Sequence, residues 1–217
     1  MAAVPLPYIG TGPGNSQQIL GHYSVAQVSG ATVSLAANAF IASVRWAPTN
    51  PQTYFVLQRL LVGWAVSGAV TAATIMDASA RIVRGFTTDF TTAATGVVLN
   101  GVQNTNQMRK TMNPSQMAAS GPKICTTATM SGQALVSDVV PFRNTVWVNQ
   151  PSGNGTVTQA VGVAGQTQAL YEWTALGAHP VVLSNFEGIV VQNPTANVVT
   201  GTIQYYVTWE WAEVFVF

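Results

Sequence analysis

The sequence predicts an all-β fold, an antiparallel β-sandwich or a jelly-roll-like domain. Short runs rich in Val, Thr and aromatic residues follow one another along most of the 217-residue chain. Gly, Pro and Asn residues separate these runs at intervals of about ten residues, as in sandwiches and barrels. No stretch keeps apolar residues at helical spacing for three turns between capping residues. A chain of this length can bury a core as one domain.

The first element is an extended N-terminal arm, expected over residues 1–22. It contains Pro5, Pro7 and Pro13, and it lacks the basic and continuous apolar regions of a secretory signal. Residues 23–217 are expected to form one β-sandwich domain. Its candidate strands are 32–36, 40–46, 54–66, 69–76, 80–87, 97–102, 124–130, 134–140, 145–149, 156–163, 167–175, 180–184, 187–192 and 202–216.

Two of these runs alternate between apolar and polar residues most clearly. In 202–210 every second residue is apolar, which predicts a strand with one buried face. The run 56–66 alternates as well, with Val56 and Leu60 on its apolar face and Gln58 interrupting it. Both runs are therefore expected to be half-buried antiparallel strands.

Residues 60–76 carry no charge and approach the length of a membrane-spanning helix. The run is rich in Ala, Gly and Thr, and Ser67-Gly68 in its middle is a turn signal. Two strands joined by a turn explain this composition better than a helix, because β-branched and aromatic residues flank the turn.

The chain is poor in charge. Eight Lys and Arg and seven Asp and Glu give a net charge of +1, and charged residues make up 7% of the sequence, against about 25% in a typical soluble domain. Few charges are available to keep copies apart. A surface of this kind is expected in a membrane protein or in one covered by other subunits. We expect the second, as a homo-oligomer with no membrane partner.

The longest polar stretch, residues 100–123, contains the candidate contact residues Arg109, Lys110 and Met112. A loop of this length in a compact domain is usually functional or disordered. Two interpretations stay open. Its methionines, which include Met117, could hold a long connection to its own core, or the loop could contact a neighbouring subunit.

The chain ends on an apolar segment, Val214–Phe217. Aromatic residues occupy one face of the final strand through Trp211, and Glu213 takes the next position on that face. A one-residue bulge near Ala212 would restore the phase. Because the strand end is apolar on both faces, it needs cover on both. We expect this end to contact another subunit or a shell through Trp211, Val214, Phe215, Val216 and Phe217.

The sequence contains no pattern typical of a catalytic site. His22 and His179 lie outside any metal-ligand spacing, and Cys125 is the only cysteine. The Gly-rich residues 10–14 lack the spacing of a phosphate-binding loop, and the basic residues are scattered, which disfavours nucleic acid. We expect no enzyme, cofactor or metal site. A lectin-like module remains an alternative, since six tryptophans could stack on sugars; they are Trp46, Trp64, Trp147, Trp173, Trp209 and Trp211.

The C-terminal third resembles the closing segment of a group of tailed-bacteriophage virion proteins. The segment is "NFEGIVVQNPTANVVTGTIQYYVTWEWAEV", residues 185–214, with a Glu-Gly-hydrophobic strand, a Thr/Gly-bearing link and a final W-x-E-V strand. Upstream, "LQRLLVGWAVSGAVTAATIMDASARIVRGF" and "MRKTM" resemble segments of the same group. The resemblance spans residues 54–214, and the order of the segments carries it.

The resemblance implies a structural virion protein, assembled in the host cytoplasm, with other virion proteins as partners. A capsid decoration (cement) protein that binds the major capsid protein and stabilises a bacteriophage head fits size and composition best. The major capsid protein itself is disfavoured, because its fold has a long spine helix that this sequence lacks. A β-rich tail, neck or fibre-base component is the main alternative.

Overall fold

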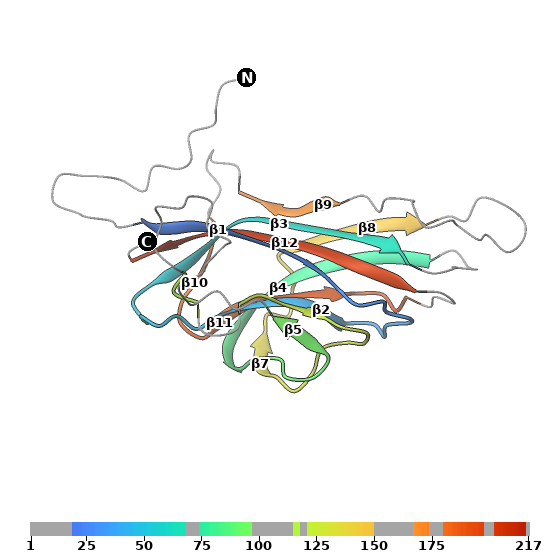
Figure 1. The fold of residues 1–217 in the computed structure, drawn as a ribbon, viewed down its shortest axis with the longest axis horizontal. Coiled ribbons are helices and arrows are strands. Elements are labelled where there is room, and N and C mark those ends of the chain that lie inside the picture. Colours follow the sequence, from blue (N-terminus) through green and yellow to red (C-terminus); the bar gives the residue numbers. More distant parts are fainter. Residues whose placement is uncertain are drawn as a thin grey trace, which may run out of the picture.

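The protein is an antiparallel β-sandwich of two sheets, as the sequence predicted (Figure 1). The computed structural model describes residues 19–67, 74–96, 115–117, 121–149, 167–173, 180–197 and 202–215. Within these ranges the regular structure consists of strands, with no helix. None of the described segments is a helix that could cross a membrane.

The first sheet places the last strand of the sequence at its centre. Its order is β1-β12-β3-β10, and β9 also pairs with β3. Every one of these pairings is antiparallel. The strands are β1 (Ile19–Val28), β12 (Ile203–Val214), β3 (Tyr54–Val66), β10 (Val181–Leu183) and β9 (Gln168–Glu172).

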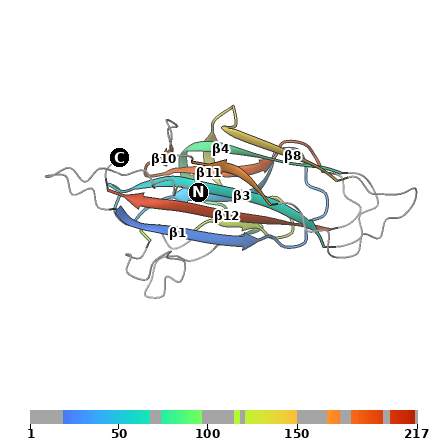
Figure 2. The same ribbon diagram turned by 90° about the horizontal axis from the view of Figure 1, so that it is seen from above.

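The second sheet is built around β11 and the long strand β4. Its order is β5-β6-β2-β11-β4-β7, and the first half of β4 pairs with β8 on the same side as β7. From above, β1 and β8 lie near opposite sides of the molecule (Figure 2). The strands are β5 (Ala94–Gly96), β6 (Lys123–Cys125), β2 (Ala39–Trp46), β11 (Glu187–Asn193), β4 (Thr74–Thr88), β7 (Ala134–Ser137) and β8 (Arg143–Asn149).

Aromatic side chains fill the core between the sheets. Trp211 stacks between Tyr23 and Phe55, at ring-centroid distances of 5.6 and 5.5 Å. Trp46 packs against Phe55 at 5.7 Å, which joins the two sheets. All four side chains are fully buried. Each such pair adds about 0.5–1.5 kcal/mol to the hydrophobic stabilisation of burial.

Strand β12 keeps its alternation to the end, so the bulge expected near Ala212 is wrong. The register shifts lie on its neighbours instead. Leu20 is an extra residue on β1 between the pairs Ile19↔Val214 and Gly21↔Glu213, and Gln58 is an extra residue on β3. The inward face of β12 therefore continues through Trp211 to Glu213, which is completely buried.

The bulge at Gln58 also corrects the expected face of Val56. Because one extra residue moves every later side chain across the sheet, Phe55 and Leu57 join Leu60 in the main core, and Val56 lies on the outer face. The structure also bears on residues 60–76 and on the N-terminal arm. Residues 60–76 belong to strands β3 and β4 in their described parts, as predicted. The arm ends earlier than expected, because β1 begins at Ile19.

Candidate functional site

Three of the most exposed large apolar side chains lie close together in sequence. Val136 on β7 is 68% exposed, and Val139 and Val140 in the following turn are 87% and 74% exposed. Residues 136–140 are termed the valine tip below. The tip is at the edge of the second sheet. A group of exposed apolar side chains is typical of a surface that contacts another protein.

The valine tip is held firmly against β4. The amides of Asp138 and Phe142 donate to carbonyl oxygens of β4 at 2.8 and 2.9 Å. The guanidinium of Arg81 on β4 donates to the carbonyl oxygen of Val139. A backbone fixed in this way loses little conformational entropy when a partner binds its side chains. The valine tip is therefore suited to binding another protein.

Charged side chains lie next to the valine tip. Arg84 on β4 donates to the Glu187 carboxylate, and its Nε lies 4.0 Å from Asp138. The hydrogen bond to Glu187 raises the pKa of Arg84 above its usual value. Partial burial acts to raise the pKa of Glu187, but hydrogen bonds from Ser184 and Arg84 outweigh it and lower that pKa. Both shifts favour the charged forms of Arg84 and Glu187.

Phe186, in the turn between β10 and β11, is a second exposed apolar side chain. It is 44% exposed and has a φ of 62°, a conformation that bulky side chains rarely adopt. Its amide donates to the carbonyl of Trp46 at 2.8 Å, and its carbonyl accepts from the amide of Phe86 at 2.6 Å. The Arg45 guanidinium lies 5.2 Å from the ring centroid. The surrounding backbone thus fixes an aromatic ring at the surface.

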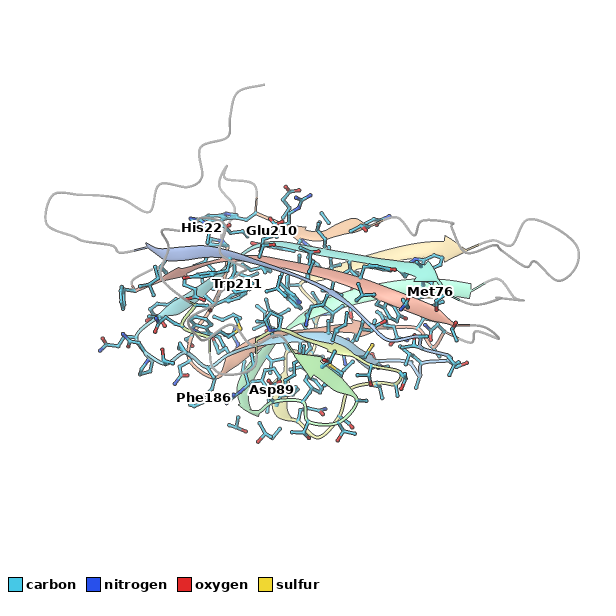
Figure 3. The ribbon with its side chains drawn as sticks, in the orientation of Figure 1. His22, Met76, Asp89, Phe186, Glu210 and Trp211 are labelled. Atoms are coloured by element: carbon cyan, nitrogen blue, oxygen red, sulfur yellow. The ribbon has the colours of Figure 1, made fainter. Side chains whose placement is uncertain are left out.

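The structure places the predicted contact residues differently. Trp211 is 0% and Val214 1% exposed, and Phe215 is half-buried. Figure 3 shows Trp211 pointing between the sheets, whereas His22 and Glu210 lie on the outer side of the first sheet. The other predicted contact residues lie outside the described part of the chain; they are Arg109, Lys110, Met112, Val216 and Phe217.

The strand end receives cover on both faces from its own chain. Trp211 is in the aromatic core, and Val214 belongs to a separate cluster on the outer face of the first sheet. That cluster joins Val214 to Val56 and Ala212, with Tyr54, Trp173 and Val182 packed against it. The expectation that Trp211 and Val214 contact a neighbouring subunit is therefore corrected. Their burial against these residues already removes them from water.

The segment that follows the long polar stretch is part of the core. Met117 is completely buried and forms an isolated antiparallel β-bridge with Pro48. For Met117, this agrees with the interpretation that methionines anchor the long connection in the core of its own domain. Residues 100–114, which include Arg109 and Lys110, lie outside the described residues, so the second interpretation stays a prediction.

Glu213 is the most unusual polar group of the described structure. Its side chain is 0% exposed and accepts hydrogen bonds from Ser115 Oγ, the Gln116 amide and Trp211 Nε1. The last two measure 2.7 and 3.0 Å. Burial raises the pKa of Glu213, and these three hydrogen bonds act in the opposite direction without cancelling the effect. The strand-end alternation already placed Glu213 on the apolar face, but its partners could not be identified from sequence.

The described residues offer little that resembles catalytic chemistry. No group of three or more His, Cys, Asp or Glu side chains among them could hold a metal ion. His22 Nδ1 lies 3.2 Å from Gln58 Oε1 on the outer face of the first sheet. Cys125 is buried, and burial raises the pKa of its thiol to about 12, so it stays in the unreactive thiol form.

The tryptophans do not form an exposed aromatic platform in the described structure. Trp46, Trp209 and Trp211 are fully buried, and Trp64 is 8% exposed. Trp173 is half-buried and packs against both apolar clusters. The side chain of Trp147 lies outside the described part.

Comparison with known proteins gives no relative from which to assign a function. No protein-family model matches the sequence, and no curated protein matches it either.

Proposed function

We propose that the protein is a structural component of a bacteriophage particle, a decoration protein that binds the capsid shell through the valine tip. The observation that carries this proposal is the fixed display of Val136, Val139 and Val140 on a protein with very few charges. A rigid apolar projection of this kind fits into a pocket of a preassembled partner. The resemblance of residues 54–214 to tailed-phage virion proteins supports the same role.

The architecture is compatible with this role. A sandwich of two antiparallel sheets buries its aromatic core between them. Charge-poor surfaces tolerate close contact with neighbours, because few charged groups have to lose their hydration. We also propose that copies associate as a homo-oligomer on the particle, with a trimer as the expected form.

The first test is the location of the protein in purified particles. Quantitative mass spectrometry of separated heads and tails would give its position and copy number. We expect the protein in heads, at a copy number that is a fixed ratio to the major capsid protein. Recovery with tails alone would favour a tail, neck or fibre-base role, and absence from particles would overturn the proposal.

The second test separates the contact surface from the fold. Val139→Ser with Val140→Ser should abolish binding to undecorated heads and leave the melting temperature nearly unchanged, because exposed side chains contribute little to folding. The matched control is Val28→Ser with Val33→Ser, which are 48% and 56% exposed elsewhere. Equal binding by the two double variants would show that the valine tip is not the contact.

A further inference from the structure

A buried carboxyl joins two segments that are far apart in the sequence. Ser115 Oγ and the Gln116 amide are both bound to the Glu213 carboxyl, 98 and 97 residues away. Ser115 Oγ also accepts a hydrogen bond from the Met117 amide at 3.0 Å. Thr49 holds the same segment from the other side, because its amide donates to the Gln116 carbonyl at 2.8 Å and its hydroxyl donates to Gln116 Oε1 at 2.6 Å. Residues 115–117 together with Glu213 are termed the carboxyl clasp.

Glu213 is the ionisable side chain of the carboxyl clasp, and the described groups that contact it are uncharged. The 115–117 segment contributes Ser, Gln and Met, and β12 contributes the indole of Trp211. From β3, Phe55 pairs with Glu213. From β1, Tyr23 is the titratable group that interacts with it electrostatically, and burial first, then Glu213, raises the pKa of this phenol. Tyr23 thus stays neutral wherever Glu213 titrates, and the described residues place no cation in contact with the Glu213 carboxyl.

We propose that the carboxyl clasp is a pH-sensitive lock, closed when Glu213 is protonated and weakened when it ionises. A carboxylate buried without a counter-ion is costly, because neutral donors replace only part of its hydration. Release of residues 115–117 would let water reach the carboxylate and remove that cost. This inference concerns the folded chain itself and does not depend on the proposed function.

The sign of the effect follows from linkage. The pKa of Glu213 is raised in the closed form from its ordinary value of 4.5. Below that value Glu213 is protonated whether the clasp is open or closed, and pH has no effect. As the pH rises toward the raised pKa, the open form loses its proton first, so opening becomes more favourable by up to tenfold per pH unit. Above the raised pKa the effect reaches its limit.

The test is hydrogen exchange at the Gln116 and Met117 amides, corrected for the intrinsic pH dependence of exchange. In the wild type, we expect protection at both amides to fall as the pH rises above about 4.5, by up to tenfold per unit. Glu213→Gln keeps the shape and cannot ionise, so its protection should be independent of pH. The Phe142 amide, which follows the valine tip and donates to β4, is the internal control and should not respond.

A direct titration protects the test against a variant that fails to fold. The carbon-13 shift of the wild-type Glu213 carboxyl should titrate with a midpoint above 4.5. A midpoint at or below that value would overturn the proposal, and so would wild-type protection at Gln116 that does not change with pH. If Glu213→Gln showed the same pH dependence as the wild type, another group would be responsible.

Discussion

Two tryptophans of β12 provide a matched measurement of one buried hydrogen bond. Trp209 and Trp211 lie on the same face of the same strand, and both are fully buried. Trp211 Nε1 donates to Glu213 Oε1 at 3.0 Å. Trp209 Nε1 has no hydrogen-bond partner within the described structure. Replacing each with Phe removes the same atoms but only one hydrogen bond.

The expected difference can be worked out from this contrast. The loss of packing is similar in Trp209→Phe and Trp211→Phe, so it largely cancels between them. Trp211→Phe also deprives a buried acceptor of a donor, which costs about 1–3 kcal/mol. Glu213 Oε1 keeps its bond from Ser115, so we expect the lower part of that range, about 1–2 kcal/mol. For a domain of this size, that is about 2–8 °C in melting temperature.

The assay is urea unfolding followed by far-ultraviolet circular dichroism, which does not depend on tryptophan fluorescence. Trp211→Phe should have the lower midpoint, with the slope of the transition unchanged. Combining each variant with Glu213→Gln gives the control: the coupling energy should be clear for Trp211 and near zero for Trp209. Equal costs for the two tryptophans, or a larger cost at Trp209, would refute the hydrogen-bond account.

Three other variants test separate parts of the fold. Gly188→Ala should destabilise the protein by about 1–3 kcal/mol, because the new Cβ would lie 2.4 Å from a carbonyl oxygen of β2; an unchanged melting temperature would contradict this. Lys123→Ala should lower the stability of the protein by about 2–4 kcal/mol, since its partner Asp89, 3.2 Å away, is largely buried. Arg59→Ala removes one member of an exposed ion pair and should lower the stability by less than about 1 kcal/mol. Thermal unfolding of the two variants compares these losses. Cys125 should resist alkylation at pH 8 until the protein unfolds, because burial raises its pKa to about 12; rapid labelling of the native protein would be the contrary result.

The sequence predicted the sandwich because local patterns decide it. The alternation in 202–210 survives intact in β12, and the described parts of residues 60–76 belong to two strands, with β3 ending at Val66 and β4 beginning at Thr74. The face of Val56 was predicted wrongly for a nonlocal reason. A bulge is a relation between two strands, and the extra residue Gln58 can be recognised only beside its partner β12.

The site was predictable only in part for the same reason. The apolar strand end correctly indicated a need for cover on both faces, but the cover for Val214 comes from Val56 and its neighbours, not from another subunit. The sequence could not show this, since those residues are distant along the chain. The sequence predicts one strand over residues 134–140, whereas β7 ends at Ser137, so the valine tip was not predicted. The adjacent valines before Pro141 were the available signal for an apolar turn.

The central position of β12 has a consequence for how the protein is made. This strand pairs with β1 on one side and β3 on the other, although both are synthesised long before it. During translation, the backbone groups of β1 and β3 that pair with β12 therefore stay unpaired until β12 leaves the ribosome. Pairings between such distant segments form slowly, and exposed edges can join other chains meanwhile. Folding of the first sheet is thus expected to be completed only after β12 has been synthesised, and to gain from chaperones that shield nascent strands.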